Sequence, residues 1–257
     1  MDVIIFCGQS NMQGQTEGLP QQNEPVKGAW EYHALTDSFV ELKHPVGEDM
    51  LNGFIKAAHE GGGTMVPAFC RAYIEKTGKK VLAIHTAKGS TTIAEWQLGT
   101  QCYHYALEKI RAGLKKARET DEVERVYFVW LQGESDGLIK TKKEQYLERL
   151  IALKNQIKKD VGIDKFGIIR VGYFALEKED NEAIFGAQEE AVQTDGDFIM
   201  LTRICEELSR DCFNKEYMSV YGHYNNKAQN MIGADAGKTL GNFTIKTEGR
   251  KNGRNYF

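Results

Sequence analysis

The chain has 257 residues, which is enough for one large α/β domain with an ample core. Its composition is that of an ordinary globular protein, 41% hydrophobic and 27% charged. The formal net charge of −3 shows no basic excess, so no nucleic-acid partner is expected. No apolar run approaches the roughly 18 residues typical of a membrane span, so no membrane contact is expected either.

The N-terminal sequence and the cysteines favour a cytoplasmic location. The first residues carry no basic stretch followed by a cleavage site, so they do not resemble a signal peptide, although a leader removed earlier would leave no trace. The five cysteines are odd in number and match no zinc-binding spacing. We therefore expect reduced structural thiols, no bound metal and a cytoplasmic location.

Five apolar runs have the length and composition of buried strands. They are Val3–Cys7, Val81–Thr86, Val126–Leu131, Phe166–Phe174 and Phe198–Leu201. Helical periodicity lies between them and after the last, in Val66–Lys76, Leu107–Ala117, Lys142–Lys159, Ala183–Val192 and Lys227–Leu240. Thr141 and Glu144 are spaced as a capping box for the third of these helices. The alternation predicts a parallel sheet with helices on both faces.

The chain carries no dinucleotide-binding glycine motif and no P-loop, so no nucleotide cofactor is expected. Without repeats or a low-complexity linker, residues 1–245 form one predicted domain, followed by a polar tail at 246–257. The stretch 13–63 is far longer than ordinary loops. Its aromatic residues, Trp30, Tyr32 and Phe39, favour an insertion that folds over the strand ends and shapes a pocket.

The first strand runs directly into Gly8-Gln9-Ser10-Asn11-Met12. A glycine at the end of a strand allows a sharp turn of the backbone. In open α/β sheets, ligands bind in the crevice outside the carboxyl ends of the strands. Ser10 therefore stands where an acyl-transfer nucleophile is expected.

Three further polar segments follow predicted strands. They are His85–Trp96, Trp130–Asp136 and Tyr221–Asn226. Ester hydrolysis by a serine requires a base for the hydroxyl proton, donors for the oxyanion and an acid that orients the base. The predicted sheet edge offers His223 as the base, the amides of Ser10 and Gly89 with the side chain of Gln132 as donors, and Glu134 or Asp136 as the acid.

These motifs together resemble a known family. They are Gly8-Gln9-Ser10-Asn11-Met12, Gly89-Ser90-Thr91 with Trp96 close behind, Gln132-Gly133-Glu134-Ser135 and the late His223. In this combination and order the chain is similar to the sialate O-acetylesterase family of the SGNH hydrolase superfamily, which includes acetylxylan esterases of carbohydrate esterase family 6. The likeness extends from residue 3 to about residue 240.

The resemblance implies an α/β/α sandwich with a five-stranded parallel sheet of flavodoxin-like order. It implies a serine esterase that removes acetyl groups from a carbohydrate through an acetyl-enzyme, with no metal or organic cofactor. Ser10 would be the nucleophile and His223 the base. The oxyanion hole would comprise Ser10, Gly89 and Gln132. Further substrate contacts are expected from Gln9, Asn11 and Trp96.

One position departs from the superfamily pattern. The aspartate usually found three residues before the histidine is replaced by Val220, which cannot orient an imidazole. Either Glu134 acts as the helper acid, with Asp136 and Asp211 as lesser candidates, or the triad is degraded. In the second case the protein would be a carbohydrate-binding homologue with weak or no catalysis. An esterase of the same superfamily acting on a small ester other than a sugar is a further alternative.

Overall fold

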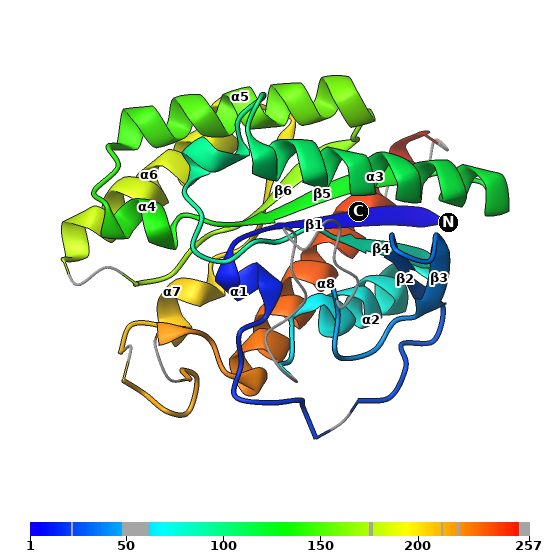
Figure 1. The fold of residues 1–257 in the computed structure, drawn as a ribbon, viewed down its shortest axis with the longest axis horizontal. Helices are drawn as coiled ribbons and strands as arrows, with labels where there is room; N and C mark the ends of the chain where they lie inside the picture. Colours follow the sequence, from blue (N-terminus) through cyan, green and yellow to red (C-terminus); the bar gives the residue numbers. More distant parts are fainter. Residues whose placement is uncertain (22, 48–61, 175–176, 212, 220–221, 252–257) are drawn as a thin grey trace.

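The computed structural model describes residues 1–21, 23–47, 62–174, 177–211, 213–219 and 222–251. A central sheet lies between two layers of helices (Figure 1). The sheet has seven strands: β1 Asp2–Gly8, β2 Ala29–His33, β3 Ser38–Glu41, β4 Val81–His85, β5 Arg125–Leu131, β6 Lys165–Ile169 and β7 Phe198–Thr202. Their spatial order is β3-β2-β4-β1-β5-β6-β7.

The five strands expected from the sequence form, but the run expected as Phe166–Phe174 is a strand only as far as Ile169. They pair in parallel in the order β4-β1-β5-β6-β7, which is the flavodoxin-like order. Strand β1 is central, and Val3–Cys7 are at most 1% exposed. Helices cover both faces of a parallel sheet, so its central strands are continuously apolar rather than alternating.

The expected number of strands is too low, because β2 and β3 lie inside the stretch predicted as a pocket-shaping insertion. Strand β2 adds to β4 in parallel, and β3 pairs with β2 in antiparallel fashion. Tyr32 of β2 is 1% exposed and packs edge-on against Phe39 of β3, with 6.3 Å between the ring centroids. These aromatic residues therefore build the sheet edge. Residues 48–61 of the same stretch lie outside the described part.

The helical elements are α1 Ser10–Gln13, α2 Val66–Thr77, the 3-10 helix η1 Ile93–Trp96, α3 Gln101–Thr120, α4 Glu134–Leu138, α5 Lys143–Val161, α6 Lys178–Thr194, α7 Ile204–Leu208 and α8 Asn226–Lys251. Helices α3, α5 and α6 cover one face of the sheet, and α2 and α8 the other (Figure 1). Helix α8 continues to Lys251, so residues 246–251 of the expected tail are helical.

The capping box expected before α5 does not form. Lys142 is the residue at the N-cap, and no side chain caps the helix. The hydroxyl of Thr141 instead donates to Asp136 Oδ1 at 3.0 Å, because the α4–α5 turn brings that buried carboxylate within reach. Thr141 thus ties the α4–α5 turn to α4 rather than capping α5.

Four cysteines in the described part, Cys7, Cys70, Cys102 and Cys205, are buried and form no disulfide, while Cys212 lies outside it. Burial raises the pKa of the Cys102 thiol to about 12. None of the helices that the structure describes is long and apolar enough to cross a bilayer.

Candidate active site

The turn from β1 into α1 presents Ser10. Gly8 has a φ of +151°, and a Cβ at this position would lie 1.9 Å from the carbonyl oxygen of Leu131. The Gln9 N–H donates to that same oxygen at 3.1 Å. Only glycine fits here. Ser10 then becomes the first residue of α1, where backbone N–H groups have no partner within the helix.

Gly89 lies directly beside Ser10. The loop that carries it is tied to β1 by the Lys88 N–H, which donates to the carbonyl oxygen of Gly8 at 3.0 Å. A Cβ on Gly89 would lie 3.5 Å from Ser10 Cβ and 2.9 Å from Gln13 Oε1. The Gly89 N–H donates to that Gln13 oxygen at 2.8 Å. The Gly89 N–H is therefore near Ser10, and it is already bonded to the side-chain oxygen of Gln13.

Gln132 occupies a different role from the one expected. Its side chain is fully buried, and Nε2 donates to Thr91 O at 2.8 Å and to Asp136 Oδ2 at 2.6 Å. Gln9 Oε1 lies 3.2 Å from the same nitrogen. A side-chain amide has two hydrogens, so these acceptors leave none for an oxyanion. Gln132 braces the loops after β4 and β5.

The lesser acid candidates both support local structure. Asp136 Oδ2 also accepts from the Ile93 N–H at 2.8 Å, which fixes η1 against α4. Burial raises the pKa of Asp136, although its hydrogen bonds oppose that change. Asp211 is exposed and accepts from the Phe213 N–H at 3.0 Å within a turn.

Glu134 is bonded to Asn11 of the neighbouring helix α1. Its Oε1 accepts from Asn11 Nδ2 at 2.8 Å, and its Oε2 is buried without a partner. Glu134 is 3% exposed. Burial raises the pKa of its carboxyl group, and the hydrogen bond from Asn11 only partly offsets this rise.

Asn11 links Glu134 to the segment that carries His223. Its Oδ1 accepts from the Tyr224 N–H at 3.2 Å, and its backbone carbonyl accepts from Gln229 Nε2 at 3.0 Å. The half-buried His223 ring packs edge-on against Phe174, with 5.8 Å between centroids. Ser10 and His223 thus belong to segments joined by Asn11. Val220, the position that departs from the superfamily pattern, lies outside the described residues.

Two expected substrate contacts serve the interior instead. Both polar groups of the Asn11 side chain are used by Glu134 and Tyr224. Trp96 is 1% exposed, donates from Nε1 to Thr91 Oγ1 at 2.9 Å and packs edge-on against Trp130 at 5.6 Å. A buried indole has no face to offer a sugar ring. The Gln13 contact with Gly89 was missed, although Gln13 stands one helical turn after Ser10.

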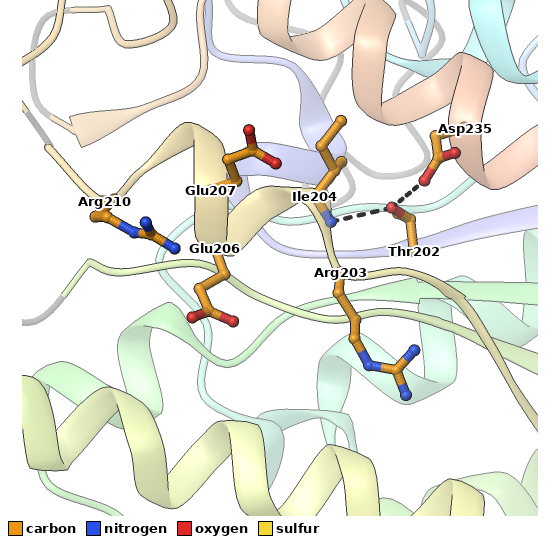
Figure 2. Close-up of a pocket in the computed structure, with 7 residues that line it drawn as sticks. All are labelled: Thr202, Arg203, Ile204, Glu206, Glu207, Arg210 and Asp235. Carbon is orange, nitrogen blue, oxygen red and sulfur yellow. Dashed lines mark hydrogen bonds between the residues drawn. The ribbon is translucent and has the colours of Figure 1, made fainter.

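A surface pocket of about 480 Å³ lies at the carboxyl end of β7. Figure 2 shows its lining, in which Thr202 donates to Asp235 and accepts from the Ile204 N–H. The lining is completed by Arg203, Glu206, Glu207 and Arg210. It contains none of the predicted site residues and carries charges of both signs. Across the described part of the chain, no group of three or more potential metal ligands forms.

Comparisons with known proteins place the chain in a family. The model of the family described as "carbohydrate esterase, sialic acid-specific acetylesterase" matches residues 1–239. No curated protein sequence is significantly similar.

Solved structures show the same fold. A protein from Arabidopsis thaliana has 18% identity and a TM-score of 0.72, covering 94% of this chain and 98% of that chain. A lipase/acylhydrolase from Enterococcus faecalis has 12% identity and a TM-score of 0.54, covering 95% and 97%. A carbohydrate acetylesterase from Xanthomonas citri has 14% identity and a TM-score of 0.56, covering 94% and 56%. With the family match over most of its length, the chain belongs to the carbohydrate esterase family of sialic acid-specific acetylesterases and is a hydrolase of ester bonds with an SGNH-type fold.

Proposed function

We propose that the protein is a serine esterase that removes O-acetyl groups from a carbohydrate through an acetyl-enzyme intermediate. The observation that carries this proposal is the position of Ser10. It begins α1 at the carboxyl end of β1, and the backbone of Gly89 approaches its Cβ. A nucleophile with backbone donors at its side is the arrangement that acyl transfer requires.

In this mechanism the Ser10 hydroxyl attacks the acetyl carbonyl carbon while His223 accepts the hydroxyl proton. The Ser10 N–H and the Gly89 N–H donate to the oxyanion, which requires the Gln13 oxygen to leave Gly89. The protonated His223 then gives its proton to the departing sugar oxygen, and neutral His223 later activates water to release acetate. Hydrogen bonds between nucleophile and base are often long without substrate and tighten when it binds.

Glu134 acts in this scheme as a positioning residue. Its bond to Asn11 Nδ2 holds an amide whose oxygen accepts from the Tyr224 N–H, next to His223. The connection orients the histidine segment relative to α1. Catalysis without the third member of a triad still exceeds that in water by a wide margin.

A carbohydrate-binding protein without catalysis is the second candidate. It is favoured by one observation: Glu134 bonds to Asn11 and leaves its other oxygen without a partner. Such a protein would bind acetylated glycans but release no acetate.

The deciding experiment measures acetate release from a panel of O-acetylated sialic acids, acetylated xylo-oligosaccharides and small non-sugar acetyl esters. Wild type is compared with Ser10→Ala. We expect release that depends on Ser10, with the best substrate naming the class of sugar. No release from any member, with Ser10 unreactive toward a fluorophosphonate probe, would instead support the binding protein. An active, pure Ser10→Ala variant would exclude the serine mechanism.

A further inference from the structure

Another cavity, of about 330 Å³, lies at the edge of the sheet formed by β2 and β3. Glu31 and His33 of β2 and Glu41 of β3 belong to its wall, together with residues of the segment that follows β3. Strand β4 separates β2 from β1, the strand that leads to Ser10 (Figure 1). The volume is within the range of small-ligand sites, so the wall is worth reading as a binding surface.

Glu31 is a buried carboxylate in the wall of this cavity. The residue is 1% exposed, and its Oε1 accepts from the Gly47 N–H at 2.7 Å. Its other oxygen, Oε2, lies 3.4 Å from Nε2 of His33. A carboxylate oxygen accepts up to two hydrogens, so this pair of contacts leaves Glu31 able to accept more.

His44 adds a donor to the same wall. The residue is 4% exposed, and its Nδ1 accepts from the Thr64 N–H at 3.3 Å. Burial lowers the pKa of the ring to about 4, so at neutral pH the ring is neutral and carries its proton on Nε2. Within the described part of the chain this Nε2 has no hydrogen-bond partner, and it is not among the fully buried side-chain atoms that lack one. The Nε2–H group is therefore accessible at the cavity that His44 lines.

Two exposed side chains of opposite charge, Glu41 and Lys43, also line the cavity. Among the residues that the structure describes, neither side chain forms an ion pair or a hydrogen bond. A ligand with a full charge of either sign would meet a like charge here. Uncharged hydroxyl groups meet no such penalty, because they can donate to a carboxylate and accept from an ammonium or an imidazole N–H.

The rest of the wall is apolar. Val40 and Pro45 are half-buried and offer carbon surface between the polar groups. A pyranose ring matches this mixture, since it carries hydroxyl groups around its rim and C–H groups on its faces.

We propose that this cavity binds a neutral pyranose unit of a glycan, at a site separate from Ser10. Hydroxyl groups of the sugar donate to Glu31 and Glu41 and accept from Lys43 and from the Nε2–H of His44, while the ring packs against the two apolar side chains. The inference goes beyond the proposed esterase activity, because binding here involves no bond to Ser10 and no chemical step.

The test titrates ¹⁵N-histidine-labelled wild type with xylotriose and follows the ring resonances of His44. Xylotriose carries no acetyl ester, so its binding is measured whatever the outcome of the acetate-release assay. We expect a saturable shift of the His44 Nε2 resonance. We expect a weaker response to N-acetylneuraminic acid, whose carboxylate would meet Glu31 and Glu41.

Two variants localise the binding. In Glu41→Ala and in Lys43→Ala the affinity for xylotriose should fall about tenfold or more, because each removes a hydrogen bond to a charged group. Both residues are exposed, so both variants should fold as wild type does. Glu182→Ala removes an exposed carboxylate from α6, which contacts β7 at the opposite edge of the sheet, and is the matched control. It should bind xylotriose as wild type does.

The absence of a saturable His44 shift up to the solubility limit of xylotriose would overturn the inference. Wild-type affinity in both Glu41→Ala and Lys43→Ala would overturn it as well. A His44 response to glycine and none to xylotriose would also do so, because the cavity would then select a zwitterion. None of these results bears on acetate release at Ser10, so this inference and the proposed esterase function fail independently.

Discussion

Glu134 is either a helper acid that acts directly on His223 or a positioning residue that acts through Asn11. The substitution Glu134→Gln distinguishes the two. The variant keeps an oxygen that accepts from Asn11 Nδ2, so the link to Tyr224 survives. We expect kcat/KM to fall by less than about tenfold. A helper acid bonded directly to the histidine would cost about 10⁴-fold when replaced by its amide. The two interpretations thus differ by about three orders of magnitude.

The stability of the same variant follows from burial. The pKa of Glu134 lies above its ordinary value of 4.5 because burial disfavours the charged form. A group with a raised folded-state pKa contributes stability that is fully present below the unfolded pKa and is lost as the pH rises through the folded one. Each unit of difference corresponds to about 1.4 kcal/mol.

Glutamine removes this titration but leaves its NH₂ group where Oε2 now lacks a partner, at a cost of about 1–3 kcal/mol. Glu134→Gln should therefore gain stability relative to wild type as the pH rises above about 4.5. These two contributions oppose each other, so they do not determine whether the variant is more or less stable than wild type at any one pH. The informative quantity is how the difference in unfolding free energy between variant and wild type changes with pH.

The assay combines acetate release with urea unfolding monitored at several pH values. Asn11→Leu is the companion variant, because it removes both halves of the link to the His223 segment. We expect it to lose more activity than Glu134→Gln. A Glu134→Gln enzyme that is fully folded and loses about 10³-fold or more in kcat would refute the reasoning, and would show that Glu134 reaches His223 during catalysis.

Three further outcomes follow from other contacts. Gln13→Ala frees the Gly89 N–H, so kcat/KM should rise about two- to fivefold in a steady-state assay, and a fall would mean that Gln13 positions the loop. Gly8→Ala forces a Cβ against Leu131 O, and denaturation should show a loss of roughly 3 kcal/mol or more. Burial raises the pKa of Asp2 from its ordinary value of 3.8, and the stability that this group contributes is lost as the pH rises through the folded-state pKa. Asp2→Asn should therefore gain stability over wild type as the pH rises above about 3.8, and a constant difference in urea unfolding would contradict this.

The sequence by itself determined the central architecture and the position of Ser10 at the end of β1. The five apolar runs and the helical stripes are local patterns, and they produce the observed parallel order because connections between such elements are short and right-handed. The turn at Gly8 is also local. A glycine between a buried strand and a serine predicts the sharp entry into α1 that the structure shows.

Only the tertiary structure decided which hydrogen bonds each side-chain amide makes. Gln9, Asn11 and Gln132 are similar polar side chains at one sheet edge, and their sequence positions do not reveal how their hydrogen bonds are distributed. The Asn11 side chain donates to Glu134 and accepts from the Tyr224 N–H, two residues that are far apart in the chain. The Gln132 side chain donates to Thr91 O and to Asp136 Oδ2, which belong to segments that follow two different strands.

The edge strands β2 and β3 also depend on contacts between segments that are distant in the chain. Strands β2 and β3 are short and partly exposed, so their alternation is weak in the sequence. They become regular because β4 offers a free edge to β2 and β2 offers one to β3. Trp96 likewise became a core residue because Thr91 of the preceding loop and Trp130 of β5 meet it there. Local periodicity specifies buried elements, whereas the partners of edge strands and polar side chains exist only once distant segments have come together.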